Sequence, residues 1–278
     1  PSIGAIEAGF TVFNQLRGDW LTKLAEFNLE YHANVQYLVD QNVTIEEPSL
    51  PKTLKIGVFT APNIYIPDIM GALDVLGSIP NATFYYLSHK EEISKSLVGL
   101  GPRMLADTPL DDCPPLDVLV FGATHPRYIE DKKILDFVLK QDKNKAVIVS
   151  VCAGTFIVGA TGLLKGRKAT TNYHQTSDLS KVGVTYMGNE VEEDGSFLSA
   201  GPAVGSYQVG LRAVEKLLGK QWSQYIEHES LEFAPKPIFG TVPKTASKSI
   251  LNVTHIASFF LRKLYRPAIR NGYFSKVE

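Results

Sequence analysis

The sequence predicts an α/β fold in which a doubly wound, mostly parallel sheet lies between helices. Four short apolar runs are rich in β-branched residues and lack polar alternation, which is typical of strands buried on both faces of a parallel sheet. Helical patterns separate these runs, and such alternation implies right-handed crossovers that cover both faces of the sheet. Apolar stripes with helical spacing near both ends of the chain predict additional N- and C-terminal helices.

The composition is that of a globular chain. The 278 residues suffice for one large domain or two modest ones. Hydrophobic residues make up 44 % and charged residues 21 %, which excludes a disordered, collagen-like or coiled-coil chain. With 28 basic and 29 acidic residues the formal charge is −1, so the chain has no global attraction to nucleic acid. We therefore expect no nucleic-acid partner.

Nothing in the sequence predicts a membrane span or a secretion signal. No run of about 18 apolar residues occurs, and the N-terminus lacks a basic region followed by an apolar core. Cys113 and Cys152 are too few for a disulfide framework, and we expect both to be reduced. We therefore expect a cytoplasmic protein without a membrane partner. Secretion stays open, because the chain starts at Pro1 and carries three short Asn-x-Thr sequons.

Residues 1–51 form a predicted helical extension and linker. Apolar residues that step by three or four positions predict an amphipathic helix, or two with a break near Gly18. Two prolines in 46–51 predict the linker. We expect this extension to pack on the main domain or on a second subunit. The stripe consists of Phe13, Leu16, Trp20, Leu24, Phe27, Tyr31, Val35 and Leu38.

Residues 52–236 form the predicted main domain. A helix that begins near Tyr207 is expected to end at Gly219, because glycine is favoured directly after a helix. The segments 184–188 and 196–199 are interpreted as shorter strands, with an antiparallel direction left open. The other expected elements are strands at 55–60, 83–87, 117–122 and 146–151, and helices at 68–76, 129–140 and 155–164.

Residues 237–278 form a predicted C-terminal helical extension. A second amphipathic stripe predicts its helix, with Thr245 or Ser247 available as the N-terminal cap. The stripe consists of Val253, Ile256, Phe260 and Leu264.

The sharpest local feature is the segment 150–154, Ser-Val-Cys-Ala-Gly. A buried strand runs into a turn of small residues and a helix begins at once, which is the layout of a nucleophile elbow. Cys152 then lies at the carboxyl edge of the sheet, where open α/β folds bind ligands. The N-terminus of the following helix favours the thiolate, which is the reactive form. The alternative is that Cys152 is a small buried hydrophobic residue.

Metal and nucleotide chemistry find no support. The six histidines are scattered without the spacing of metal ligands, so we expect no metal site. The glycine-rich patterns that bind nucleotide phosphates are absent, and we expect no cofactor.

Five segments resemble the DJ-1/PfpI superfamily, a class I glutamine amidotransferase-like group. The strongest are 149–154 (Val-Ser-Val-Cys-Ala-Gly) and 162–171 (Gly-Leu-Leu-Lys-Gly-Arg-Lys-Ala-Thr-Thr). Residues 67–76, 113–120 and 199–205 are similar to a first helix with an acidic residue, the entry to the third strand and the last strand-to-helix turn. The motifs follow the family order over about 52–235 and most resemble the isonitrile hydratase-like branch. The resemblance implies a flavodoxin-like fold.

The resemblance also implies two catalytic residues. Cys152 corresponds to the elbow nucleophile, and Asp68 corresponds to the acidic partner beside its sulfur. Burial and a nearby thiolate both raise a carboxyl pKa, so Asp68 is expected to be able to carry a proton and donate it. The alternative for Asp68 is a helix N-cap after Pro67, a role that Asp favours.

The implied oxyanion donors are the backbone N–H groups of Ala153 and Ala123. The sequence departs from the family in this region. Relatives usually carry Pro-Gly-Gly in the turn that reads Gly122-Ala123 here, and alanine accommodates fewer backbone angles than glycine. The branch often has Thr where this chain has Ala153, and Asp where it has Gln208.

Further candidates are substrate contacts. His174 and His125 can approach the site, and histidine suits acid–base work at neutral pH, but a hydrogen-bonded structural role fits each equally well. Gly122 is a third candidate contact. Ala153 occupies the position of the histidine of PfpI-like peptidases, and Asp68 that of the glutamate of glyoxalase-type members, so both activities are disfavoured.

The leading functional hypothesis is a cysteine-dependent enzyme for a small-molecule substrate, most concretely an isonitrile hydratase-like lyase that forms an N-substituted formamide. One alternative is a non-enzymatic redox or stress sensor whose Cys152 is oxidised. Another is a binding or structural member that has lost catalysis, as the altered turn at Ala123 suggests. Family members commonly pair, so a homodimer is expected, with the two apolar stripes extending its interface.

Overall fold

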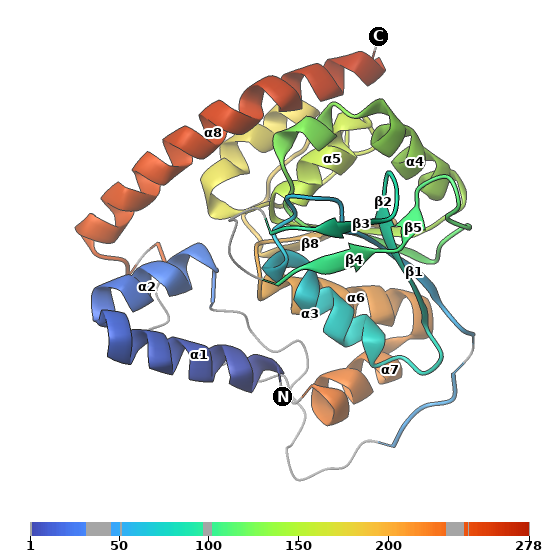
Figure 1. Ribbon diagram of the computed structural model, residues 1–278, viewed down its shortest axis with the longest axis horizontal. Helices are drawn as coiled ribbons and strands as arrows, with labels where there is room; N and C mark the ends of the chain where they lie inside the picture. Colours follow the sequence, from blue (N-terminus) through green and yellow to red (C-terminus); the bar gives the residue numbers. More distant parts are fainter. Residues whose placement is uncertain are drawn as a thin grey trace.

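A seven-stranded sheet forms the centre of the computed structural model, which describes residues 2–31, 46–50, 52–96, 102–231, 242–243 and 245–277 (Figure 1). Its strands follow the order β5-β2-β1-β6-β7-β9-β8, all parallel to their neighbours except β8, which is antiparallel to β9. A separate antiparallel pair joins β3 and β4. The bounds are β1 (Lys55–Phe59), β2 (Thr83–Ser88), β3 (Glu92–Ser94), β4 (Met104–Ala106), β5 (Thr108–Pro109), β6 (Val118–Phe121), β7 (Val147–Val151), β8 (Val191–Asp194) and β9 (Phe197–Ala200).

Helices cover both faces of this sheet (Figure 1). On one face lie α3 (Pro67–Gly77), α6 (Gly205–Leu218) and α7 (Lys220–Tyr225), and on the other lie α4 (Lys132–Lys143) and α5 (Thr155–Ala160). Every residue of β6, β7 and β9 is buried, as unalternating apolar strands require. The predicted doubly wound α/β fold is confirmed.

Most predicted elements of the main domain are confirmed, but one predicted strand does not form and two helix boundaries are wrong. The predicted strand 184–188 contributes only a single bridge, between Thr185 and Lys168. The helix after Cys152 ends at Ala160, because the turn that follows carries Gly162 at φ 81°. The helix predicted at 129–140 begins later, as α4, because Asp131 caps it; the residues before it form the short 3₁₀ helix η1 (Pro126–Ile129).

The N-terminal extension forms two helices, α1 (Ser2–Arg17) and α2 (Asp19–Asn28). The break falls at Gly18, whose φ of 78° suits glycine, so the predicted interruption is confirmed. Phe27 and Tyr31 are buried against the rest of the protein, whereas Leu16 is 74 % exposed. Val35 and Leu38 lie outside the described residues, as do Pro51 and the predicted boundary at 236–237.

The C-terminal extension is one long helix, α8 (Lys248–Val277), which runs along the outside of the domain past α5 with its first turns beside α2 (Figure 1). The hydroxyl of Ser247 accepts from the backbone N–H of Ile250 at 3.4 Å, as expected of a cap. The helix packs on η1, α5 and the 3₁₀ helix η3 (Tyr173–Val182).

The predicted apolar stripe of α8 does not form its buried face. Ile256 and Phe260 are 60 % and 63 % exposed, and the face that meets the domain carries Thr254, Ser258 and Tyr265. Small and polar residues were not part of the stripe, because hydrophobic spacing alone cannot tell an inward face from an outward one. The expectation that this stripe extends a dimer interface stays a prediction.

Close packing of α3 on α6 fixes the position of the first helix. Gly71 lies against α6, and a Cβ added there would come within 2.7 Å of the backbone nitrogen of Tyr207 and would overlap the hydroxyl of Ser206. Gly77, at the other end of α3, is exposed and has nothing within 4 Å of an added Cβ. The same helix therefore contains a glycine that packing requires and one that packing does not.

We predict that Gly71→Ala lowers the free energy of unfolding by about 1–3 kcal/mol, because the added methyl forces α3 away from α6. Gly77→Ala is the matched control, expected to be neutral or stabilising by about 0.5–1 kcal/mol because alanine favours the helix. Urea unfolding of both variants measures the difference. Equal stability of the two variants would contradict the close approach of the helices.

Candidate functional site

Cys152 occupies a sharp turn between β7 and α5. Its φ of 57° lies in the left-handed region, which is unusual for a residue with a side chain, and the short 3₁₀ helix η2 (Cys152–Gly154) follows it directly. Gly154 makes the turn possible, because a Cβ there would lie 2.7 Å from the carbonyl oxygen of Phe121 on the neighbouring strand. This geometry is that of the predicted elbow.

Asp68 lies in the first turn of α3, and its side chain is fully buried. One carboxyl oxygen accepts from the backbone N–H of Ala123 at 2.9 Å, and the other accepts from that of Ala203 at 3.1 Å. The N-cap alternative is wrong, because Ile66 holds that position and no side chain caps the helix. Ala203 has a φ of 49°, so a second strained turn serves the same carboxyl group.

The carboxyl of Asp68 and the thiol of Cys152 are neighbours, close enough for the thiol to act on the pKa of the carboxyl and the carboxylate on that of the thiol. Burial raises the pKa of Asp68 to about 6. Interactions with the two backbone N–H groups and with Cys152 lower this pKa and so limit the rise. The predicted direction of this shift is confirmed. At neutral pH the carboxyl is nevertheless mainly ionised, so the S–H group donates and the carboxylate accepts.

The prediction that Cys152 favours the thiolate is wrong for the resting protein. Burial, and then the charge of Asp68, raise the pKa of the thiol well above its usual value. The helix that was expected to lower it has only six residues, so its end offers little compensating charge. The structure instead brings together a buried thiol and a buried carboxylate that can take its proton.

Two groups limit the rise in the pKa of the Cys152 thiol by hydrogen bonding to its sulfur. The backbone N–H of Ala153 is one, and its predicted role as an oxyanion donor stays a prediction. The side chain of Asn172 is the other, a residue that sequence reasoning missed. The one sequence signal for Asn172 is its place directly after the Thr170-Thr171 motif, two positions before the candidate His174.

Hydroxyl groups behind the cysteine hold the turn in place. Thr171 donates from Oγ1 to the carbonyl oxygen of Cys152 at 2.7 Å, and Thr155 donates to that of Thr170 at 2.9 Å. The N–H of Thr170 donates to the hydroxyl of Ser199 on β9 at 2.8 Å. The segment 170–171 thereby ties the elbow to the neighbouring strand.

The turn after β6 carries the backbone N–H of Ala123, which was predicted to be an oxyanion donor and is bonded to Asp68 instead. Ala123 keeps a negative φ, so alanine fits there without the strain that its substitution for glycine suggested. Its N–H is used by Asp68, and its carbonyl accepts from the N–H of Tyr65 at 2.7 Å. Gly122 allows α3 to approach, because a Cβ there would lie 2.9 Å from Ile69 and 3.0 Å from Asp68.

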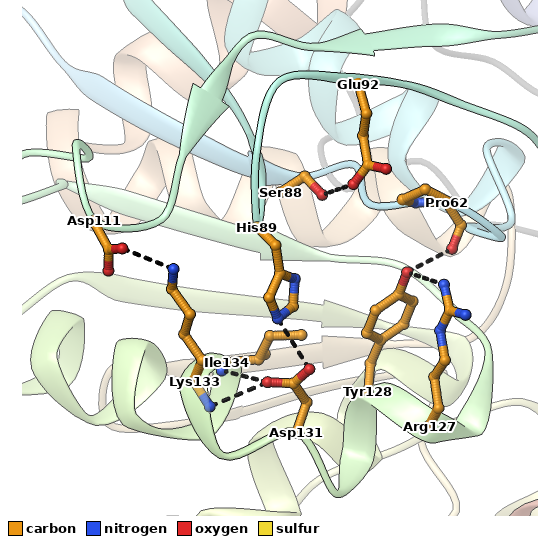
Figure 2. A network of polar contacts seen from close by, with 10 residues as sticks. All are labelled: Pro62, Ser88, His89, Glu92, Asp111, Arg127, Tyr128, Asp131, Lys133 and Ile134. Carbon is orange, nitrogen blue, oxygen red and sulfur yellow. Dashed lines mark hydrogen bonds and ion pairs between the residues drawn. The ribbon is translucent and has the colours of Figure 1, made fainter.

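A polar network braces the outer side of this turn (Figure 2). Tyr128 donates to the carbonyl oxygen of Pro62 at 2.9 Å and accepts from Arg127 at 2.6 Å. His89, just after β2, pairs with Asp131 at 2.9 Å. The network links the loop before α3 to the start of α4, so it supports the segments that carry Asp68 and Ala123. In the same region Ser88 donates to Glu92, Lys133 donates to Asp111, and the backbone N–H of Ile134 donates to Asp131 (Figure 2).

The two candidate histidines are engaged elsewhere in the structure. Nδ1 of His125 accepts from the backbone N–H of Arg127 at 3.2 Å, which caps η1. His174 contacts both extensions, through Ser258 of α8 at 2.7 Å and Asn28 of α2 at 3.2 Å. Burial lowers the pKa of His174, so its ring is neutral at pH 7. Their roles as substrate contacts stay predictions, and structural roles are the ones these bonds support.

Both extensions reach the site. Tyr265 of α8 donates to the carbonyl oxygen of Thr124 at 2.5 Å, and its pKa is raised by burial and then by the charges of Cys152 and Asp68. Glu30, just after α2, accepts from the backbone N–H of Tyr173 at 2.8 Å, and its charge contributes to the raised pKa of Cys152. Sequence reasoning missed both residues, since no local motif links them to the cysteine.

Metal-binding clusters and membrane-spanning helices are both absent from the described part of the chain. No group of three or more His, Cys, Asp or Glu side chains there is arranged to hold a metal ion. No helix among those residues has the length and apolar character needed to cross a bilayer.

We predict that Asp68→Asn lowers the pKa of the Cys152 thiol by roughly one unit or more, about 1.4 kcal/mol, because a nearby negative charge is removed. Glu30→Gln is expected to lower it less, since the charge of Asp68 has the larger effect. The pH dependence of iodoacetamide labelling, read on the Cys152 peptide by mass spectrometry, measures both shifts. The Cys113 peptide is the internal reference, and an unchanged profile in Asp68→Asn contradicts the coupling.

Comparisons with known proteins find relatives of this chain. Residues 68–216 match the DJ-1/PfpI family. The chain is 30 % identical over 202 residues to isonitrile hydratase from Pseudomonas putida, an alignment that covers 72 % of this chain and 87 % of that protein.

Solved structures share the fold. A THiJ/PfpI family protein from Pseudomonas syringae has a TM-score of 0.70 and 22 % identity, covering 87 % of this chain and 98 % of that one. DJ-1beta of Drosophila melanogaster has a TM-score of 0.59 and 21 % identity, covering 66 % and 100 %. The implied flavodoxin-like fold is confirmed. Because sequence and fold agree over the same segment, the chain belongs to the DJ-1/PfpI family and most resembles its isonitrile hydratase-like branch.

Proposed function

We propose that the protein is a cysteine-dependent lyase that adds water to an isocyanide (isonitrile) to give an N-substituted formamide. The observation that carries this proposal is the buried pair of Cys152 and Asp68, in which a thiol donates to a carboxylate with a pKa of about 6. Such a pair can deliver a nucleophile and a proton to one carbon atom. The resemblance to the Pseudomonas putida isonitrile hydratase supports the choice of substrate.

The first step forms a bond between the sulfur and the terminal isocyanide carbon. The proton of Cys152 moves to the carboxylate of Asp68 as the sulfur attacks, and Asp68 then gives that proton to the same carbon. The product is a thioimidate, R–N=CH–S, in which no atom has been lost. The N–H of Ala153 stabilises the sulfur while it carries negative charge.

The second step consumes water. Water adds to the carbon of the C=N bond, and its departing proton reaches the nitrogen through Asp68, giving R–NH–CH(OH)–S. The C–S bond then breaks, and the hydroxyl proton returns to the sulfur, which releases R–NH–CHO and restores the thiol. The N–H groups of Ala123 and Ala203 hold Asp68 in place, so their proposed role is positioning rather than direct contact with the oxygen of the substrate.

The two alternative hypotheses have weaker support. A redox sensor works best with an accessible thiolate, whereas Cys152 is only 9 % exposed and its pKa is raised. A member that has lost catalysis has no need of a strained elbow whose thiol is bonded to a buried acid. Both alternatives predict no turnover of isocyanides.

We predict that the protein converts a simple alkyl isocyanide to its formamide, and that Cys152→Ala and Asp68→Asn each lower the rate by at least about 100-fold, since each removes one partner of the proton transfer. Proton NMR of the formyl hydrogen measures the product. Trapping the thioimidate on the Cys152 peptide, with a mass gain equal to that of the isocyanide, identifies the nucleophile. Full activity in Cys152→Ala contradicts the mechanism.

The rate is also expected to depend on pH in one direction. Asp68 acts as a base, so kcat/KM should fall as the pH drops below about 6, where the carboxyl takes up a proton, and should level off above that value. Initial rates between pH 5 and 8, corrected for the uncatalysed hydrolysis, measure this profile. A rate that rises as the pH falls through 6 rules out Asp68 as the base.

A further inference from the structure

A cavity of about 410 Å³ opens beside the elbow, within the size range of small-molecule sites. It borders the reactive cysteine through Thr171, which lines the cavity and donates from its hydroxyl to the carbonyl oxygen of Cys152 at 2.7 Å. Its walls also include Phe27, Glu30, Tyr173, Tyr186 and Glu190.

Two of these wall residues carry carboxylates. Glu30 is held by the backbone N–H of Tyr173 at 2.8 Å, and its Oε2 lies so close to Gly201 that a Cβ there would overlap it. Its charge acts on both sides of the cavity, since it raises the pKa of Cys152 and, after burial, that of Tyr186. The described residues that line the cavity include no lysine, arginine or histidine.

Three aromatic residues also line the cavity, beside threonine and other small or polar residues. Phe27 and Tyr173 meet edge to face with ring centroids 5.2 Å apart, which orders both rings beside Glu30. Tyr186 also lines the cavity and is 44 % exposed, so its ring is available to a bound molecule. Aromatic rings together with carboxylates are the groups that recognise organic cations.

A buried acceptor stands next to the cavity wall in the chain and acts on the sulfur. Asn172 stands in the chain between two wall residues, Thr171 and Tyr173, and its side chain hydrogen-bonds to the sulfur of Cys152. It is only 4 % exposed, and its Oδ1 has no partner among the described residues. A ligand that reaches from the cavity to the sulfur can satisfy this oxygen with an N–H group.

We propose that the cavity is a subsite for an organic cation, and that the substrate of Cys152 carries an ammonium group a few atoms from its reactive carbon. This inference rests on the proposed reaction at Cys152 for its choice of substrate. Glu30 and the rings of Phe27 and Tyr173 are the specificity-determining groups, and two of the three come from the N-terminal extension.

The test compares two isocyanides of the same shape, 2-(trimethylammonio)ethyl isocyanide and the neutral 3,3-dimethylbutyl isocyanide. We expect kcat/KM to favour the cation by at least 10-fold in the unmodified protein. Glu30→Gln, which keeps an acceptor for the N–H of Tyr173, should reduce this preference at least 5-fold. Glu215→Gln, near the far end of α6, removes the same charge elsewhere and should leave the preference unchanged. Equal kcat/KM for both isocyanides overturns the subsite.

A binding measurement separates the subsite from the reaction. Calorimetry on Cys152→Ala compares choline with 3,3-dimethyl-1-butanol, its neutral counterpart, with and without Glu30→Gln. Binding of choline that weakens at least 5-fold in Glu30→Gln supports the subsite even if no isocyanide is hydrated, in which case only the proposed reaction fails. Hydration of isocyanides together with equal binding of choline and the alcohol leaves the reaction standing and overturns the subsite.

Discussion

The carboxyl group of Asp68 is the constraint on which the reactive edge of the sheet depends. A buried negative charge is costly unless several donors surround it. Here the donors are two backbone N–H groups, from Ala123 and Ala203, and one thiol. They come from three segments that are distant in the sequence and adjacent at the carboxyl ends of the strands. The left-handed turns at Cys152 and Ala203 are the local strain that this convergence requires.

The balance between burial and hydrogen bonding also decides which partner holds the proton. Full burial disfavours both ionised forms, but Asp68 has backbone donors on both oxygens, whereas the sulfur has fewer. The charge therefore rests on the carboxylate and the proton on the sulfur. A neutral thiol with 9 % exposure reacts slowly with oxidants and chance electrophiles. In the proposed reaction the nucleophilic thiolate forms only as the sulfur attacks a bound substrate and its proton passes to Asp68.

The sequence allowed the central elements and the elbow to be predicted because their causes are local. Buried parallel strands need unbroken apolar runs, and Gly18 and Gly219 stand where the backbone takes angles that other residues avoid. What failed depended on tertiary contacts. Tyr265 contacts Thr124 across 141 positions, and Glu30 contacts Tyr173 across 143, so no spacing rule reveals either. The apolar stripe of α8 was a wrong guide to its buried face for the same reason, because tertiary contacts decide which face of a helix is buried.

Glu30 and Phe27 belong to a segment that precedes the main domain, whereas Cys152 and Asp68 belong to the domain itself. Reactivity and selectivity are therefore carried by different parts of the chain. The reactive pair is held by the backbone of the core, whereas Phe27 and Glu30 supply part of the wall of the proposed subsite. Mutations at that wall can alter selectivity while the acid and the thiol keep their geometry. Substitutions in the N-terminal helices can therefore change which substrates are selected while the reacting groups stay intact.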